Sequence, residues 1–264
     1  MLIAQLSDLH VRPKGQLYRD VIDSNETLRQ AIAHLQNLDL PPDLVLFTGD
    51  LVDEGLPEDY TMLREILAGL AIPYFVMPGN HDHRENLRAA FADQTYLPKS
   101  GALHYVIEHF PVRVLALDCS VNRRHHGDIE SDGLRWLETT LEAQPSKPTL
   151  IALHHPPMVS GIAYLDEYRY LDSARLEAVI SKFSNVEAVI CGHVHRTMIR
   201  RWAGTVLVAC PSTATEIALQ LDPKATPKSY LGPRACMLHF WQEGQGLVSH
   251  LSFIGTYPGP YPFF

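Results

Sequence analysis

Five short apolar segments of the sequence each end in side chains that can bind a metal ion. These segments end at Ser7-Asp8-Leu9-His10, Gly49-Asp50, Gly79-Asn80-His81-Asp82, His154-His155 and Gly192-His193-Val194-His195. In an α/β sheet the carboxyl ends of parallel strands share one edge, so residues far apart in the sequence converge there. The repeated position at a strand end is therefore stronger evidence for a shared site than any single residue.

The side chains at these ends form a mixed set of ligands. They comprise two aspartates, one asparagine and at least four histidines, which suits Zn, Fe, Mn or Co. A calcium site would consist mostly of oxygen ligands. Seven side chains exceed what one tetrahedral ion uses, whereas two ions about 3.5–4 Å apart and bridged by a carboxylate use all of them. The number of ligands therefore favours two metal ions.

In this order, the motifs D-x-H, G-D, G-N-H-D, H-H and G-H-x-H resemble the signature of the calcineurin-like metallophosphoesterases. They span Asp8 to His195, about three quarters of the chain, and no motif position departs from the family pattern. In chain length and motif spacing, the sequence is most similar to the bacterial class III cyclic nucleotide phosphodiesterases and glycerophosphodiesterases.

The resemblance implies two adjacent metal sites. The ligands of the first are Asp8, His10, Asp50 and His195. The ligands that complete the second are Asn80, His154 and His193. Asp50 would bridge the two ions.

The resemblance also implies the catalytic groups. His81 would face the substrate, where it stabilises phosphoryl oxygens or protonates the leaving alkoxide, and Asp82 would orient His81 or its loop. Two cations would neutralise the phosphate and lower the pKa of a bound water towards about 7, so that hydroxide attacks in line. The sequence contains neither a G-x-S-x-G elbow nor a G-x-x-x-x-G-K-[ST] loop, which argues against a serine hydrolase or a P-loop NTPase.

Several nearby residues have simpler interpretations. Either His154 or His155 could be a ligand, and the first is preferred only through the family pattern. Asp53 is a candidate for support of the site and equally for a helix or loop cap. The cluster Arg123–His126 favours a solvated loop over a phosphate contact, and Cys191 favours packing. Five further histidines lie in helical or strand-like segments and are expected to be structural: His34, His104, His109, His239 and His250.

Strand-like and helix-like segments alternate along the chain, which predicts a layered α/β domain with a largely parallel sheet. The expected strands are 2–6, 44–47, 74–77, 112–117, 150–153, 188–191 and 206–209. The expected helices are one after Ser24 as N-cap, one after Pro57, and 84–91, 133–142 and 173–183. With the family resemblance, the expected fold is a four-layer α/β/β/α sandwich.

The end of the chain differs from the rest. Residues 1–200 are expected to form the catalytic core, and residues 201–264 a β-rich part that completes the sandwich, with strands at 235–241 and 247–253. A loop at 216–234 is expected to cap the site or to mediate oligomerisation. The tail Gly255–Phe264, rich in proline and aromatic residues, resembles an extended strap.

Composition limits the partners. The chain has 264 residues, 46% hydrophobic and 20% charged, with a net charge of −8. This charge argues against extended nucleic acid as a partner, and no segment approaches the ~20 apolar residues of a membrane span. The first apolar run lacks a basic leader, and the four cysteines are widely spaced without a Cys-x-x-Cys pair. We therefore expect a cytoplasmic protein with reduced, buried cysteines.

These features predict a phosphodiesterase for a small soluble diester such as a cyclic nucleotide or a glycerophosphodiester. A phosphomonoesterase or nucleotide pyrophosphatase is the main alternative, disfavoured because the motif segments lack Arg and Lys apart from those in adjoining loops. A non-catalytic scaffold is a third possibility, but such proteins should have damaged motifs. The resemblance further implies a homo-oligomer, a dimer or higher.

Overall fold

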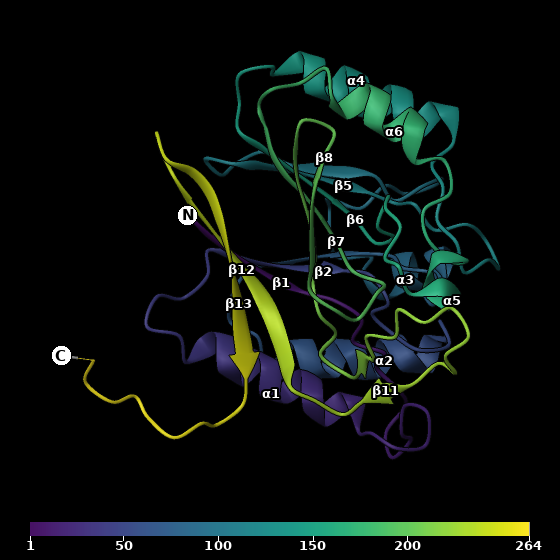
Figure 1. Ribbon diagram of the computed structural model, residues 1–264, viewed down its shortest axis with the longest axis vertical. Helices are drawn as coiled ribbons and strands as arrows, with labels where there is room; N and C mark the ends of the chain where they lie inside the picture. Colours follow the sequence, from purple (N-terminus) through teal and green to yellow (C-terminus); the bar gives the residue numbers. More distant parts are fainter. Residues whose placement is uncertain (264) are drawn as a thin grey trace.

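Two β-sheets are stacked face to face between helices in the computed structural model, which describes residues 1–263. The first sheet has the order β13 (Gly246–Ile254), β12 (Arg234–Gln242), β1 (Leu2–Leu6), β2 (Leu44–Thr48) and β3 (Tyr74–Met77). The second has the order β4 (Tyr105–Ile107), β5 (Arg113–Leu117), β6 (Thr149–Leu153), β7 (Val186–Cys191), β9 (Thr205–Ala209) and β8 (Met198–Trp202). In Figure 1, helices α1 (Ser24–Gln36) and α2 (Pro57–Leu67) lie outside the first sheet, and α4 (Ser131–Ala143) and α6 (Ser173–Ile180) lie outside the second. The expected α/β/β/α sandwich is confirmed.

Both sheets are mixed rather than largely parallel. Strands β1, β2 and β3 are parallel, but β12 and β13 are antiparallel additions. In the second sheet β5, β6, β7 and β9 are parallel, and β4 and β8 are antiparallel edges. The turn between β8 and β9 consists of Ala203 and Gly204, both with positive φ, which is the backbone of a tight hairpin and returns the chain antiparallel. The sequence analysis did not predict β4 or β8.

The central strands of the second sheet are buried on both faces, which explains their continuous apolar sequences. Their small residues Ala116, Ala152 and Ala188 join the core that contains the first sheet and α1. The intervening larger residues, such as Leu115 and Ile151, join a second core with α4 and α6. Each strand therefore contributes alternate residues to the core between the sheets and to the core beneath the helices.

Most predicted elements agree with the structure within about two residues, although the N-cap of α1 is a different residue from the one expected. Asp23, not Ser24, is the N-cap, because its side chain accepts a hydrogen bond from the Glu26 N–H at 3.0 Å. Ser24 is the first helical residue, and its hydroxyl donates to the His10 carbonyl at 2.7 Å. The serine therefore ties the helix to the loop after β1. Helix α6 ends at Ile180, before the expected Phe183.

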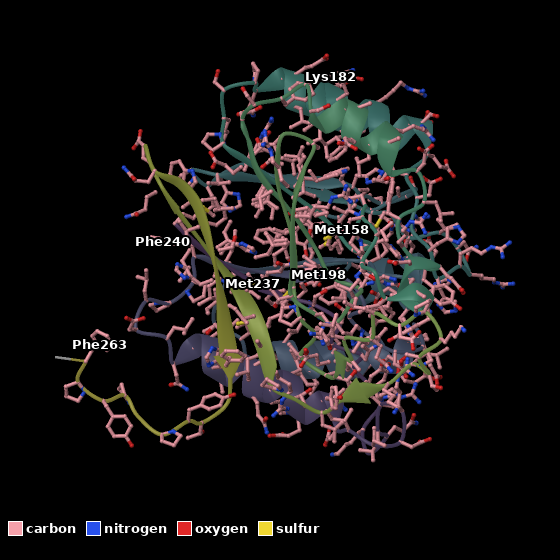
Figure 2. All side chains as sticks on the ribbon, in the orientation of Figure 1. Met158, Lys182, Met198, Met237, Phe240 and Phe263 are labelled. Atoms are coloured by element: carbon pink, nitrogen blue, oxygen red, sulfur yellow. The ribbon has the colours of Figure 1, made fainter. Side chains whose placement is uncertain are left out.

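The chain after residue 200 contributes β9 to the second sheet and β12 and β13 to the first. Between them lies a two-stranded ribbon, β10 (Glu216–Ile217) and β11 (Ser229–Tyr230). The expected extended tail is irregular over residues 255–263, and Figure 2 shows the labelled Phe263 near its end. Phe264, also part of that expectation, lies outside the described residues.

The four cysteines are free and buried, as expected. No helix within residues 1–263 is long and apolar enough to cross a membrane.

A buried polar network joins the two sheets. Gln5 of β1 donates through Nε2 to the Thr48 hydroxyl at 2.9 Å and to the Cys191 carbonyl at 3.0 Å. Its Oε1 therefore faces His239 Nε2 of β12, 3.0 Å away, while His239 Nδ1 lies 2.7 Å from the Ser249 hydroxyl. Because an amide oxygen only accepts, His239 is the donor at Nε2 and the acceptor at Nδ1. The neutral ring satisfies both partners.

His239 yields a prediction for stability in acid. Burial lowers its pKa in the folded protein to about 4, whereas about 6.5 is expected in the unfolded chain. Between these values the unfolded state binds more protons. The stability contributed by neutral His239 is therefore complete above about pH 6.5 and is lost as the pH falls towards 4. The loss should reach up to about 3 kcal/mol.

Urea unfolding of the wild type and of His239→Asn at about pH 7 and pH 4.5 measures this effect. The difference between their free energies of unfolding should narrow towards the lower pH. His250→Asn, at an exposed position of β13, is the control and should show no such narrowing. An equal difference at both pH values would show that His239 titrates normally.

Candidate dimetal site

All seven expected ligands come together at the carboxyl ends of strands from both sheets. Asp8 and His10 follow β1, Asp50 follows β2 and Asn80 follows β3, all in the first sheet. The others follow strands of the second sheet: His154 after β6, and His193 and His195 after β7. The sequence predicted one shared sheet edge. The structure forms the site between the edges of two stacked sheets, so the packing of the sheets sets its geometry.

The side chains of Asp8, His10 and His195 bring three ligand atoms close together at a first candidate metal position. His10 Nε2 and His195 Nε2 lie 3.1 Å apart, and Asp8 Oδ1 lies 3.4 Å from His195 Nε2. The opposite nitrogen of His195, Nδ1, donates to the Thr215 carbonyl at 2.9 Å, so the lone pair on Nε2 faces this point. Three ligand atoms within 4.8 Å of one another fit one metal ion.

Asp50 lies between this point and a second one. Its Oδ2 is 3.9 Å from His10 Nε2, and its Oδ1 is 3.3 Å from His154 Nε2. His154 Nδ1 donates to the Thr48 carbonyl at 2.8 Å, which leaves its Nε2 to face Asp50. The two oxygens of one carboxylate thus face the two groups of ligands, which is the arrangement of a bridge.

The second point is marked by buried polar atoms without hydrogen-bond partners. Asn80 Oδ1, His154 Nε2 and His193 Nε2 are all in this state. Ligand atoms of His154 and His193 lie within 4.8 Å of each other. Buried polar atoms are normally hydrogen-bonded, so three of them at neighbouring strand ends require an explanation. They are the three side chains expected to complete the second metal site. A metal ion would satisfy all three at once, and the residues present therefore fit a dimetal centre.

Charge supports the same conclusion. Asp8 and Asp50 are 0% and 2% exposed, and within residues 1–263 no Lys or Arg lies within 4.0 Å of either carboxylate. Burial raises the pKa of Asp8. Burial also opposes ionisation of Asp50, but the nearby His154 and His81 hold its pKa well below the usual carboxyl value. Buried carboxylates need a compensating positive charge.

The histidines differ in their protonation. Burial lowers the pKa of His195 to about 4 and also lowers the pKa values of His10 and His193. These three rings are therefore neutral at pH 7 and keep a lone pair for a metal ion. Burial opposes protonation of His154, yet the charge of Asp50 raises its pKa to about 9. A cation between these two residues would replace that proton.

Five of the seven expected ligands have a left-handed backbone. Their φ angles are 54° at Asp8, 47° at His10, 48° at Asp50, 69° at His193 and 50° at His195. This conformation costs about 1–3 kcal/mol per non-glycine residue and is concentrated at functional sites. It turns the chain sharply after β1, β2 and β7. Hydrogen bonds between adjacent segments hold it in place, for example from the Asp8 and His10 N–H groups to the Gly49 and Asp50 carbonyls.

The glycines of the motifs leave room for the site. A Cβ atom at Gly79 would lie 2.2 Å from Asp50 Oδ1, and one at Gly49 would lie 2.4 Å from His154 Nδ1. At Gly192 it would lie 1.9 Å from the Ser7 hydroxyl. Each glycine directly precedes an expected ligand. A glycine stands before each of these ligands because the strand ends approach too closely to admit a Cβ atom.

The structure separates the roles of His154 and His155. Both nitrogens of His155 have other partners: Nδ1 is 3.3 Å from Cys119 Sγ, and Nε2 donates to the His125 carbonyl at 3.0 Å. Burial raises the pKa of Cys119 to about 12, so its thiol is protonated and can donate to Nδ1. His155 thereby fastens the loop that carries His125 and Gly127, where a Cβ would lie 2.5 Å from the His155 ring.

A pocket of about 470 Å³ opens onto the expected ligands. His125 and His81 both line it, and Asn80 Nδ2 lies 3.5 Å from His125 Nδ1. Arg123, Arg124 and His125 are exposed, in agreement with a solvated loop, and His125 also lines the pocket.

His81 is held from two sides. Its Nδ1 donates to the Asp53 carbonyl at 2.6 Å, and its backbone N–H donates to Asp50 Oδ1 at 2.9 Å. Burial lowers the pKa of the ring, but the charges of Asp50 and Asp53 outweigh it and raise the pKa above the usual value. The Asp53 carboxylate also lies 3.5 Å from both His10 and His81, so Asp53 supports the site.

Asp82 does not line the pocket. Its Oδ2 accepts hydrogen bonds from the Gly79 and Leu51 N–H groups at 2.8 and 3.1 Å, and its Oδ1 accepts one from the Tyr60 hydroxyl at 2.9 Å. Burial and the charge of Asp50 raise its pKa to about 7. Asp82 therefore fixes the loop that carries Asn80 and His81.

The sequence analysis missed part of the pocket wall. The additional lining residues include Tyr18, Arg19, Tyr164, Tyr168 and Lys228. They lie in irregular segments, on β10–β11 or near the short helix α5 (Ala163–Asp166), where no periodic pattern or motif indicates them. The scarcity of Arg and Lys in the motif segments disfavoured a monoester substrate. The structure brings Arg19 and Lys228 to the same pocket from elsewhere in the chain.

The fold and this cluster define a metallophosphoesterase, and comparison with known proteins agrees. The chain belongs to the calcineurin-like phosphoesterase family, whose model matches residues 1–197.

Individual relatives make the similarity more specific. The chain is 37% identical over 265 residues to a probable glycerophosphodiester phosphodiesterase GpdQ of Arcobacter nitrofigilis, covering 100% of this chain and 97% of that protein. It is 30% identical over 217 residues to the 3′,5′-cyclic adenosine monophosphate phosphodiesterase CpdA of Escherichia coli strain K12, covering 81% and 76%. These relatives confirm the family resemblance seen in the motifs.

Among solved structures, a dimetal phosphatase from Danio rerio superposes with a TM-score of 0.64 at 14% identity, covering 97% of this chain and 99% of that one. This similarity confirms the fold.

The glycine before Asn80 gives a direct test of the site's geometry. In Gly79→Ala the added methyl group would displace Asp50, so we expect the affinity for Mn²⁺ or Co²⁺ to fall at least about tenfold. Calorimetric titration of chelator-treated protein measures this affinity. Gly69→Ala is the matched control, since a Cβ there has its nearest neighbour at 3.4 Å. If the folded Gly79→Ala variant binds Mn²⁺ or Co²⁺ as tightly as the wild type, the close contact of Gly79 with a metal-binding Asp50 is contradicted.

Proposed function

We propose that this protein is a metal-dependent phosphodiesterase that hydrolyses a small soluble phosphodiester, either a cyclic nucleotide or a glycerophosphodiester. The observation that carries the proposal is the pair of buried carboxylates, Asp8 and Asp50, together with three unpaired ligand atoms. Asp50, Asn80 and His193 of this group line an open pocket. The names of the relatives, a glycerophosphodiesterase and a cyclic nucleotide phosphodiesterase, support this reaction class.

Two metal ions of the Fe, Mn, Zn or Co type are proposed at this site. The first would be held by Asp8, His10, Asp50 and His195. The second would be held by Asn80, His154 and His193 together with Asp50. When bound, such ions neutralise phosphate charge and lower the pKa of a water molecule.

His81 is the proposed catalytic group of the protein itself. Its Nδ1 hydrogen is committed to the Asp53 carbonyl, so Nε2 is the atom that can serve the substrate in the pocket. From there it can hydrogen-bond to a phosphoryl oxygen and give a proton to the leaving alkoxide. Asp82 acts through the backbone, because it holds the loop on which His81 and Asn80 are placed.

A phosphomonoesterase or nucleotide pyrophosphatase is the second candidate. Arg19 and Lys228 line the pocket, and cationic groups suit the additional charge of a monoester dianion. The scaffold alternative is disfavoured, since the expected ligands and His81 are all present and lie together.

A homo-oligomer and a cytoplasmic location remain predictions. Strand β13 is an edge of the first sheet and exposes Val248, Leu251 and Phe253. Such an edge suits pairing with a second copy, and a monomer in solution scattering would contradict this.

Hydrolysis of a chromogenic aryl phosphodiester and of the matching monoester tests the proposed reaction. After chelation we expect no activity, and after addition of Mn²⁺, Co²⁺, Zn²⁺ or Fe²⁺ we expect restored activity with preference for the diester. Activity on the monoester alone would establish the second candidate. No activity with any metal would favour the scaffold.

Replacement of His81 separates catalysis from metal binding. We expect His81→Ala to retain both metal ions, because no nitrogen of its ring is needed as a ligand, and to reduce kcat by about 10²–10⁴-fold. Metal content by mass spectrometry and kcat on the aryl diester are the measurements. His195→Ala is the comparison and should lose metal. Full activity in His81→Ala would remove the proposed role.

A further inference from the structure

Two positively charged side chains line the pocket without acidic partners. Arg19 and Lys228 both contribute to its wall, and within residues 1–263 no carboxylate lies within 4.0 Å of either. Arg196, which is near the pocket, instead pairs with Glu216 at 2.6 Å. In a protein with a net charge of −8, two unpaired cations at one pocket indicate an anionic ligand.

The backbone presents Arg19 towards the site in an unusual way. Arg19 and Asp20 have φ angles of 49° and 58°, and the turn is closed by the Tyr18 N–H donating to the Ile22 carbonyl at 2.8 Å. Two successive non-glycine residues in the left-handed region store strain of about 1–3 kcal/mol each, a feature of functional sites. The strain places Arg19 at the tip of the loop before α1.

Contacts with Tyr18 fix the direction of Arg19. The Tyr18 ring is stacked on the His10 ring, with centroids 4.4 Å apart and an angle of 11° between planes. Arg19 Nε donates to the Tyr18 hydroxyl at 3.0 Å, and its guanidinium carbon lies 5.4 Å from the centre of the Tyr18 ring. Through Tyr18, the guanidinium is held at a fixed place relative to an expected metal ligand, while its terminal nitrogens remain available.

Lys228 directly precedes β11 and lines the pocket next to a wall of apolar and aromatic side chains. This wall includes Tyr164 and Leu165 of α5, Tyr168 and Ile217. Figure 1 shows α5, β11 and the loop before α1 on the same, right-hand side of the molecule. Flat side chains favour stacking with a planar group, and about 470 Å³ is within the range of pockets for nucleotide-sized ligands.

We propose that Arg19 and Lys228 select a phosphodiester that carries a second anionic group on one of its alcohols, of the kind found in a short dinucleotide with a terminal phosphate. The scissile phosphate already faces the proposed metal ions and His81, so additional cations at the rim match an additional charge. The planar wall would take a base. This inference rests on the proposed phosphodiesterase function and narrows its substrate class.

A matched pair of substrates tests the inference. A dinucleoside monophosphate and the same molecule with a terminal 5′-phosphate differ only in the second anion. We expect the metal-loaded wild type to cleave the internal diester of the phosphorylated substrate with a kcat/KM at least about tenfold higher. Arg19→Gln and Lys228→Gln should each reduce this preference, because each removes a cation placed beside the second anion. Equal kcat/KM for both substrates in the wild type would overturn the inference.

Two control variants distinguish the loss of a cation in the pocket from a change in the net charge of the protein. Lys14→Gln lies in the same loop as Arg19, and Lys224→Gln lies in the same segment as Lys228. Both positions are exposed and neither lines the pocket. We expect these variants to keep the wild-type preference. Loss of the preference in the controls as well would attribute it to overall charge and overturn the inference.

A binding measurement distinguishes this inference from the proposed function. Calorimetry with the metal-loaded His81→Ala variant compares the two dinucleotides without turnover. Tighter binding of the phosphorylated dinucleotide, lost in the double variant with Arg19→Gln, supports the inference. If the wild type nevertheless hydrolyses neither dinucleotide, only the proposed phosphodiesterase function is contradicted. Hydrolysis of both without any preference in binding would overturn only the inference. Release of the terminal phosphate alone would also overturn it, in favour of monoesterase activity.

Discussion

The burial of two carboxylates without a Lys or Arg partner is the constraint on which the rest of this structure depends. Asp8 and Asp50 lie between two stacked sheets, where an uncompensated negative charge costs several kcal/mol. The surrounding groups are histidines, most of them held neutral by burial, and their free nitrogens face the carboxylates. Without a cation, these buried charges and unpaired nitrogens destabilise the core, whereas a bound cation would compensate them. The fold therefore stabilises a cluster that needs metal ions.

The backbone at the strand ends follows from this cluster. Side chains that follow β1, β2, β3, β6 and β7 converge at the site. After β1, β2 and β7 the chain turns sharply through left-handed residues, at a cost of about 1–3 kcal/mol each. The motif glycines permit the close approach, and hydrogen bonds such as those from the Gly79 and Leu51 N–H groups to the Asp82 carboxylate hold the loops. The two apolar cores on either side of the second sheet supply the stability that offsets this strain.

Much of the fold and of the ligand set could be predicted from the sequence. Buried strands are continuous apolar runs, so their positions and the ligand motifs at their ends are local features of the sequence. Interactions between segments that are distant in the sequence could not be predicted in this way. The hydroxyl of Ser24 bonds to the loop after β1, which left Asp23 as the N-cap. The approach of the second sheet, the partners of His155, and the position of Arg19 and Lys228 all depend on tertiary packing, which has no local pattern.

The location of bound metal tests the central claim most directly. Anomalous X-ray diffraction from crystals of the manganese-loaded protein would show where the ions bind. We predict two peaks about 3.5–4 Å apart, on either side of the Asp50 carboxylate, one beside His10 and His195 and the other beside Asn80 and His193. Peaks elsewhere, or no peak between the two sheets, would contradict the account.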